Sequence, residues 1–227
     1  MQRVPSFRLA FHRAAQPYAD QFRRRAADMV RRLARPAEIH GKPGDLLSFP
    51  SEYSYASPTL LAFGDEPGVT HKPWVTVGKY SSICGGTRIL VGGEHHPEWV
   101  STYPFRIVKG LPGRYEDGQP SSRGPITIGN DVWVGYDVVI LSGVTIGDGA
   151  VIATGTFLRK DVEAYAKVGG NPGETFGYRF DDETIASLLR IRWWDWPDDK
   201  VLAHVSQLNG PDLAGFVAEH DPGDRAS

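Results

Sequence analysis

The stretch IGNDVWVGYDVVILSGVTIGDGAVIATGTFLRKDVE, residues 128–163, divides into consecutive groups of six residues. The first residue of every group is aliphatic: Ile128, Val134, Ile140, Ile146, Ile152 and Leu158. The fifth residue is small or β-branched, and the fourth is Asp131, Asp137, Gly143, Gly149, Gly155 or Asp161. Glycine and aspartate tolerate the positive φ that a sharp corner needs. The period therefore predicts a chain that turns a corner every six residues and points its aliphatic side chains inward.

Three such groups make one triangular coil, so residues 18 apart in sequence are expected to stack. Residues 77–90, VGKYSSICGGTRIL, keep the same period. A set of short sandwich strands is the alternative, but such strands would alternate at period two and have irregular turns. We therefore expect an all-β fold, a parallel β-helix of hexapeptide repeats with N-terminal and C-terminal helices and a long excursion loop.

The two flanks have helical patterns. Residues 16–35 carry apolar side chains at spacings of three and four, and the opposite face is rich in arginine. We interpret that face as the solvated side of a packed helix, with contact to an anionic membrane or a partner as the alternative. After the repeats, residues 181–183 begin an apolar helix that is expected to end near Pro197. The stretch RWWDWP, residues 192–197, is expected to cover the open end of the prism.

These patterns divide the chain into three parts. Residues 1–50 form a partly helical extension, residues 51–178 form the β-helix with its loop at 91–125, and residues 179–227 form a helical cap and tail. The loop is too long for a plain connector, and loops of that length in compact domains are usually functional.

Composition limits the classes of function. The chain has 227 residues, with 25 basic and 27 acidic side chains and a net charge of −2, which argues against nucleic-acid binding. It has one cysteine and so no intrachain disulfide. No apolar run reaches transmembrane length, and the N-terminus lacks the apolar centre of a secretory signal. We expect a cytoplasmic protein.

The loop carries GGEHHPEWVSTYPF, residues 92–105, with the adjacent histidines His95 and His96. The pKa of histidine lies near neutral pH, which suits it to take a proton from a hydroxyl as a general base. A nearby carboxylate, from Glu94 or Glu98, is expected to fix its tautomer by a hydrogen bond. Surface polarity or a structural hydrogen bond is the alternative interpretation of the pair.

Five motifs in order, from Glu52 to Val201, carry a family resemblance. They are HHPEWVSTYPF, IGNDVWVG, VGGNP, RFDDETIASLL and WWDWP, and SEYSYASP at residues 51–58 matches a further short aromatic motif. Together they resemble the xenobiotic acyltransferase group, which includes the hexapeptide-type chloramphenicol and streptogramin A acetyltransferases. The resemblance implies a left-handed parallel β-helix and an O-acetyltransferase that uses acetyl-CoA without an acyl-enzyme. It also implies a homotrimer with active sites in grooves between subunits.

In that family the first histidine of the loop motif is the base, and its place, six residues before Ser101, falls on His95. His96 stands where relatives often have arginine, so we treat it as accessory. Glu94 replaces the usual asparagine, a departure expected to raise the pKa of the base or alter the choice of acceptor.

The resemblance and the stacking interval suggest where the cofactor binds. Gly135, Ala153 and Asn171 are 18 residues apart, and the small side chains of the first two would let a pantetheine arm approach the backbone. The expected cofactor contacts are Trp133, Gly135, Ala153, Thr154, Lys160, Asn171 and Arg179. Lys160 and Arg179 are candidates for the cofactor phosphates. The alternative for the stacked positions is that they are only tight turns beside a packed tryptophan. The alternative for Lys160 and Arg179 is that they are solvated surface charges.

The acceptor is expected to contact Tyr53, Tyr55, His96 and Tyr103, with ordinary packing at the prism entry as the alternative for the first two. No metal is expected. Carbonic anhydrases with this prism hold zinc by three histidines, and residues 126–201 contain none.

An antibiotic-like molecule with a free hydroxyl is the expected acceptor. A sugar, polysaccharide or natural-product intermediate is the alternative, because the first 50 residues do not match the family. A non-catalytic scaffold would leave the long loop unexplained.

Overall fold

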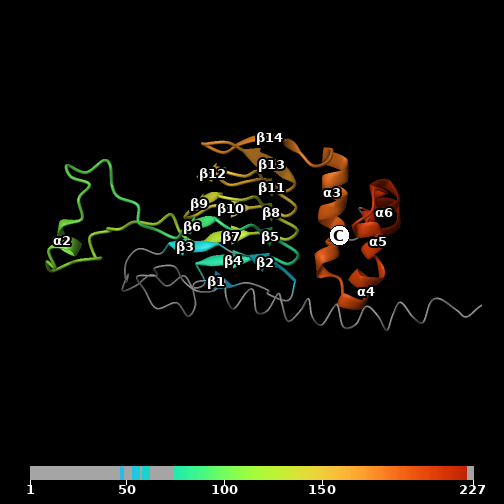
Figure 1. The fold of residues 1–227 in the computed structure, drawn as a ribbon, viewed down its shortest axis with the longest axis horizontal. Helices are drawn as coiled ribbons and strands as arrows, with labels where there is room; N and C mark the ends of the chain where they lie inside the picture. Colours follow the sequence, from blue (N-terminus) through green and yellow to red (C-terminus); the bar gives the residue numbers. More distant parts are fainter. Residues whose placement is uncertain (1–46, 49–52, 57, 62–73, 224–227) are drawn as a thin grey trace, which may run out of the picture.

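The computed structural model describes residues 47–48, 53–56, 58–61 and 74–223, without the side chains of residues 47, 48, 55 and 56. The helix expected within residues 16–35 lies outside the described residues, as does most of the N-terminal extension. The described part is a stack of triangular coils with a loop on one side and a group of helices on another (Figure 1).

Three sheets form the faces of the triangular prism, and all their strand pairs are parallel except β13 with β14. The first sheet contains β1 (Leu47–Ser48), β4 (Val75–Val77), β7 (Ile126–Ile128) and β10 (Thr145–Ile146). The second contains β2 (Tyr55–Ala56), β5 (Ser82–Ile83), β8 (Trp133–Val134), β11 (Val151–Ile152), β13 (Ala166–Gly169) and β14 (Glu174–Tyr178). The third contains β3 (Thr59–Leu61), β6 (Arg88–Leu90), β9 (Val139–Leu141) and β12 (Phe157–Leu158).

The expected inward positions are the interior of this prism. All six aliphatic residues that begin the groups are buried, as are the six at the fifth positions, Val132, Val138, Val144, Ala150, Thr156 and Val162. Five of the six expected corners have positive φ, at Asp131, Asp137, Gly143, Gly149 and Gly155. The hexapeptide period is therefore confirmed over most of its length.

The last coil departs from the period. Val134 pairs with Ile152, 18 residues on, but Ile152 pairs with Val168, only 16 residues on. Asp161 does not have positive φ; its carboxylate accepts a hydrogen bond from the amide of Thr145 at 2.7 Å. The expected stacking of Asn171 on Ala153 is therefore wrong, since the shortened turn places Gly169 over Ala153 instead.

One corner of the prism is built from the stacked residues Tyr80, Asp131, Gly149 and Tyr165, all with positive φ. A Cβ at Gly149 would overlap the ring of Tyr165. Glycine is therefore needed at this corner both because the Tyr165 ring packs against its backbone and because its φ is positive. Arg179 closes the corner, with its guanidinium 2.8 Å from Asp131 and 2.9 Å from the Gly149 carbonyl. Burial raises the pKa of Asp131, and the guanidinium opposes that shift.

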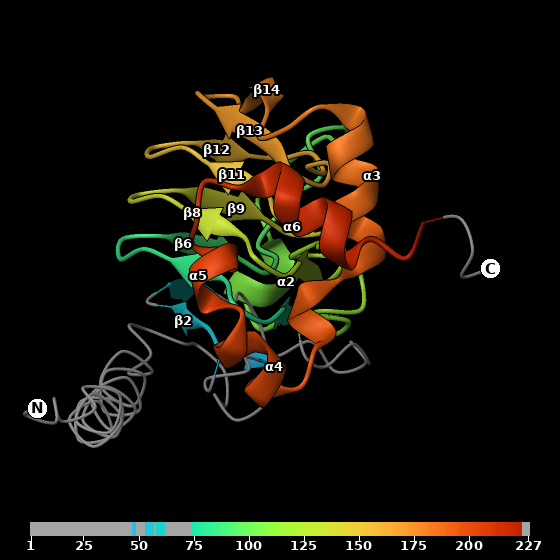
Figure 2. The ribbon, with the colours of Figure 1, turned by 90° about the vertical axis from the view of Figure 1, so that its right-hand side faces the viewer.

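The C-terminal helices pack along this corner, beside the strand stack (Figures 1 and 2). They are α3 (Asp182–Ile191), a short 3₁₀ turn (Trp193–Asp195), α4 (Asp198–Ala203), α5 (Val205–Leu208) and α6 (Leu213–His220). The Asp181 side chain caps α3 as expected, but α3 ends at Ile191, before Pro197, because Arg192 adopts the left-handed conformation.

The expected lid over the open end of the prism is wrong. Trp193 lies against Tyr80, with ring centroids 4.7 Å apart, and Trp194 is fully buried. Tyrosines at the corner positions give the prism an apolar side, so the aromatic stretch covers that side rather than the end.

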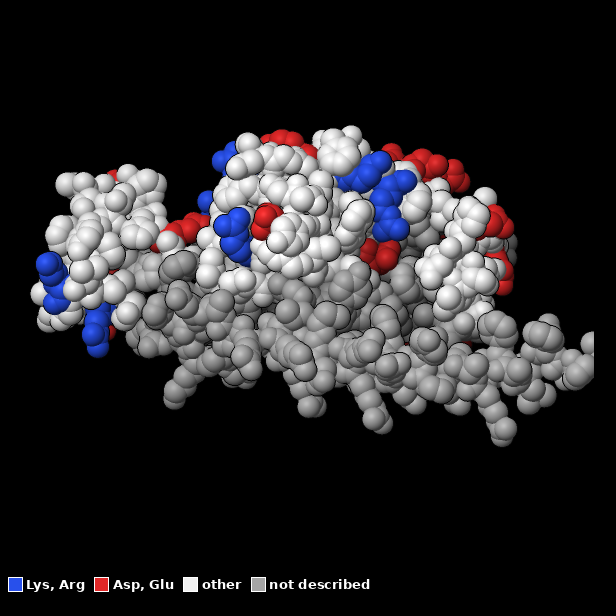
Figure 3. Space-filling model, in the orientation of Figure 1, with Lys and Arg blue, Asp and Glu red and all other residues white. Residues whose placement is uncertain are grey.

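Two further features concern the surface. On the face drawn in Figure 3, lysine and arginine lie in separate groups, with acidic residues close to several of them. Within the described residues, no helix combines the length and apolar character needed to cross a membrane.

Replacing Ile140 by Asp tests the hexapeptide register. Ile140 is fully buried between Ile89 and Leu158 of the neighbouring coils, so the substitution places an unpaired carboxylate in an aliphatic interior. We expect Ile140→Asp to lose about 4 kcal/mol or more of stability in a thermal melt. The control is Thr127→Asp, at an exposed strand position, which is expected to melt near the wild-type temperature. A stable Ile140→Asp protein would show that the register is wrong.

Candidate active site

The loop leaves the prism after β6 and returns before β7, as expected, and its neck is closed by Glu94 and Ser121. Their backbones exchange two hydrogen bonds of 2.7 and 3.0 Å. The Glu94 carboxylate lies 3.2 Å from Arg123 Nε and 3.4 Å from Ser142 Oγ. Glu94 therefore ties the neck to the prism, and the structure records no contact between its carboxylate and the His95 ring within the described residues. The expected effect of Glu94 on the adjacent base has no support in this geometry.

The tautomer of His95 is fixed by the backbone. Its Nδ1 lies 2.5 Å from the Thr102 carbonyl oxygen, which can only accept, so Nδ1 carries the proton. Nε2 then has a free lone pair on an exposed ring. The expected hydrogen bond between a carboxylate and a loop histidine is present, but it joins Glu98 to His96, whereas the partner of His95 Nδ1 is a backbone carbonyl.

His96 clamps the loop together. Its Nδ1 lies 2.8 Å from Glu98 Oε1 and its Nε2 lies 3.0 Å from the Gly118 carbonyl, while its ring stacks on Trp99 at 4.3 Å. Both ring nitrogens thus face acceptors, which favours the imidazolium. The hydrogen bond to Glu98 is the largest cause of a raised His96 pKa, and the Gly118 carbonyl adds to it. His96 is therefore engaged in the loop's own structure.

The remainder of the loop exposes apolar side chains. It contains the short helix α2 (Phe105–Val108), and Tyr103 packs edge-on against Phe105 at 4.8 Å. The exposed apolar residues of the loop are Trp99, Val100, Tyr103, Phe105, Val108 and Leu111. In Figure 3 most of the loop surface is neither acidic nor basic, with basic side chains toward its far end and acidic ones where it joins the prism. Exposed large apolar side chains gathered on one loop are typical of a contact with another protein or a ligand.

Four of the expected cofactor contacts, Trp133, Gly135, Ala153 and Thr154, lie on the second sheet and at the corner that follows it, whereas Lys160 follows β12 of the third sheet. Trp133 is exposed on β8, and Ala153 and Thr154 follow β11. A Cβ at Gly135 would lie 2.7 Å from the Thr154 amide nitrogen, so glycine is needed here for coil stacking. Tyr136, Phe176 and Tyr178 are also exposed large side chains on or beside this sheet. The sequence pattern does not single out these three residues, because the hexapeptide period marks inward positions only.

The two expected phosphate ligands differ. Lys160 is exposed, and its Nζ lies 3.9 Å from Glu174. Arg179 is bound to Asp131 and the Gly149 carbonyl and lies over the rings of Tyr165 and Phe180. The Arg179 guanidinium is therefore already used in joining the prism to the cap. Asn171 lies exposed in the turn between β13 and β14.

Tyr53 lies at the cap. Its hydroxyl donates to Asp198 of α4 at 3.2 Å, and its ring is 5.4 Å from that of Tyr80. The side chain of Tyr55 is outside the described residues. In one chain the cap and the loop lie on different sides of the prism, so Tyr53 is far from α2 (Figure 1).

The candidate residues therefore fall into three places on a single chain. His95, His96 and Tyr103 lie in the loop, most of the expected cofactor wall lies on the second sheet and its following corner, and Tyr53 and Arg179 lie at the cap. The prism itself separates these places, because the loop departs from the corner between the third and first sheets.

Comparisons with known proteins give a consistent set of relatives. Residues 125–160 match the family described as bacterial transferase hexapeptide (six repeats). A chloramphenicol acetyltransferase from Agrobacterium fabrum is 40% identical over 63% of this chain and 69% of its own length. A probable macrolide acetyltransferase from Lysinibacillus sphaericus is 36% identical over 58% of this chain and 75% of its own. A galactoside O-acetyltransferase from Escherichia coli K12 is 52% identical over 21% of this chain and 24% of its own.

The His96 clamp predicts a pH-dependent change in the loop. The His96 pKa is raised in the folded protein, so protonated His96 stabilises the loop through its bonds to Glu98 and Gly118. This stabilisation is fully present below the ordinary histidine pKa of about 6.5 and is lost as the pH rises through the raised pKa of the folded protein. Trp99 stacks on the His96 ring, so its fluorescence should change when His96 loses its proton. We expect a fluorescence transition with a midpoint above the ordinary value. It should be absent in His96→Gln and retained in His95→Gln. A transition that survives in His96→Gln would contradict the assignment.

Proposed function

Because this chain belongs to the xenobiotic acyltransferase family of hexapeptide-repeat proteins, we propose that it acetylates a hydroxyl group of an antibiotic-like small molecule, with His95 as general base. The chain is an acyltransferase, and we infer acetyl-CoA as its acyl donor because its relatives are acetyltransferases. In this proposal residues 51–178 are the catalytic unit and residues 179–227 support it. The coils wind left-handed, as the family resemblance implies.

The observation that carries the proposal is the state of His95. With Nδ1–H held by the Thr102 carbonyl, Nε2 is the atom available to accept a proton. In the reaction Nε2 removes the acceptor's hydroxyl proton while that oxygen attacks the thioester carbonyl. The carbon–sulfur bond then breaks, and the imidazolium returns the proton to the departing sulfur.

A neighbouring copy completes this site. His95 lies in the loop, while Trp133, Ala153 and Thr154 lie on another side of the same prism. The exposed apolar side chains of the loop in one subunit are suited to pack against the exposed aromatic side chains of the second sheet in a neighbouring subunit. We propose a homotrimer in which one subunit gives the base and its neighbour gives much of the cofactor wall. Contact of Lys160, Asn171 and Thr154 with the cofactor is part of this proposal.

The acceptor class has two candidates. The chloramphenicol and macrolide acetyltransferases, which match 63% and 58% of this chain, favour an antibiotic-like acceptor. A galactoside O-acetyltransferase matches a shorter segment at higher identity, which keeps a sugar or natural-product acceptor as the second candidate. In both cases Tyr103 and other exposed loop side chains would contact the acceptor beside His95, whereas His96 would act by holding the loop.

Thiol release from acetyl-CoA tests the proposal with chloramphenicol, a streptogramin A and a panel of sugars. We expect release with an antibiotic, and a rate at least about 10²-fold lower in His95→Ala, the usual size of a general-base contribution. Arg114→Ala, at an exposed position of the same loop, is the matched control and should keep wild-type activity.

Two outcomes separate the parts of the proposal. Release with sugars alone would reject the antibiotic acceptor and leave His95 as base. A His95→Ala protein as active as Arg114→Ala would reject His95 as the base, whatever the acceptor.

A further inference from the structure

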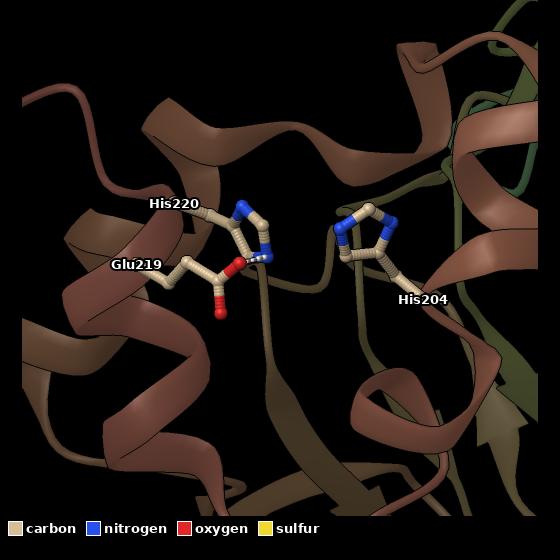
Figure 4. A group of neighbouring side chains, drawn as sticks. All are labelled: His204, Glu219 and His220. Carbon is tan, nitrogen blue, oxygen red and sulfur yellow. Dashed lines mark ion pairs between the residues drawn. The ribbon is translucent and has the colours of Figure 1, made fainter.

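The cap contains a group of side chains that acyl transfer does not use. His204 lies between α4 and α5, and Glu219 and His220 lie at the end of α6. Each offers one ligand atom, and these atoms lie within 4.8 Å of one another. Figure 4 shows the two imidazole rings facing each other, with the Glu219 carboxylate directed at the His220 ring. We propose that these three residues bind a zinc ion that ties α6 to the α4–α5 junction.

The second ring nitrogen of His204 is already engaged in the way a zinc ligand requires. Its Nδ1 lies 2.7 Å from the Lys200 carbonyl, so Nδ1 carries the proton and Nε2 keeps its lone pair. Histidines that bind metals usually donate their other N–H to a carbonyl or carboxylate, which fixes the tautomer and the ring orientation. Nε2 of His204 is thus set to bind a cation.

Glu219 is oriented by a neighbour. Gln207 Nε2 donates to Glu219 Oε2 at 2.7 Å, and the other oxygen, Oε1, lies 3.7 Å from His220 Nε2. Gln207 Oε1 also lies 3.4 Å from His220 Nε2. The amide therefore holds one carboxylate oxygen and leaves the second turned toward the histidine pair.

Aromatic packing holds the two rings in place. Trp196 lies 5.5 Å from the His204 ring and 4.9 Å from the His220 ring, and Phe216 lies 4.9 Å from His220. Ligands held in this way lose little freedom when an ion arrives.

Two imidazoles and one carboxylate form a ligand set that zinc uses, with water in the fourth position. Tetrahedral zinc with bonds of about 2.0–2.1 Å sets its ligand atoms roughly 3.3 Å apart. The 3.7 Å between Glu219 Oε1 and His220 Nε2 is near that spacing, and all three ligand atoms lie within 4.8 Å of one another. The site lies outside the prism and outside the acyl-transfer chemistry, so it adds a metal that the sequence analysis did not expect.

Zinc titration of the full chain without a histidine tag tests this proposal. Protein dialysed against a chelator is titrated with Zn²⁺ in competition with a chromophoric indicator. We expect one zinc per chain with a Kd of about 1 μM or tighter. The melting temperature should rise by roughly 5 °C at a hundredfold excess over Kd.

Matched variants locate the ion. Glu219→Gln removes a carboxylate that is largely exposed, so folding is preserved, and it should weaken zinc binding at least tenfold. Glu183→Gln makes the same change on an exposed position of α3 and should leave zinc binding unchanged. His204→Gln should also abolish tight binding. Wild-type protein that binds zinc only above about 10 μM would overturn the proposal. Loss of binding in His96→Gln, with Glu219→Gln unaffected, would overturn it equally.

Discussion

The stacking of aliphatic residues inside a narrow triangular prism is the constraint on which this structure depends. Each coil must place one aliphatic residue on each face and one small or β-branched residue near each corner, and these residues are buried throughout the repeats. A prism filled in this way has no space for a catalytic group or a ligand. Chemistry is therefore confined to the outer faces and to segments that leave the stack at a corner.

The long loop is such a segment, and its own hydrogen bonds define what it can do. The Glu94–Ser121 pair closes its neck, His96 joins two distant parts of it, and the Thr102 carbonyl fixes the His95 tautomer. The orientation of the His95 ring thus comes from a backbone atom within the loop. The paired histidines have separate tasks, since one ring has a free nitrogen and the other uses both nitrogens in structure.

Sequence reasoning predicted the features that repeat. Ile140 and its equivalents, the corner glycines and the position of the loop follow from a six-residue period that packing enforces. It failed where the period ends: the shortened turn at Asp161 moves Asn171 out of line with Ala153, and no repeat signal marks that loss. It also failed where contacts are specific to the fold. The aromatic stretch at 192–197 covers a side of the prism because Tyr80 and Tyr165 stand at that corner, and the partner of His95 is a backbone carbonyl that side-chain patterns do not reveal.

The proposed base lies on the loop and the proposed cofactor wall lies on another side of the prism, so the proposal requires each active site to be shared between subunits. Mixing two inactive variants measures this most directly. His95→Ala lacks the base, and Thr154→Trp places a bulky side chain on the exposed wall. The two variants are refolded together in equal amounts. If sites are shared, a site is intact when its loop comes from one variant and its wall from the other, which happens at about one site in four in randomly mixed trimers. The mixture should then regain about a quarter of wild-type activity. Mixed trimers as inactive as either variant alone would show that base and wall belong to one chain, and would contradict the account.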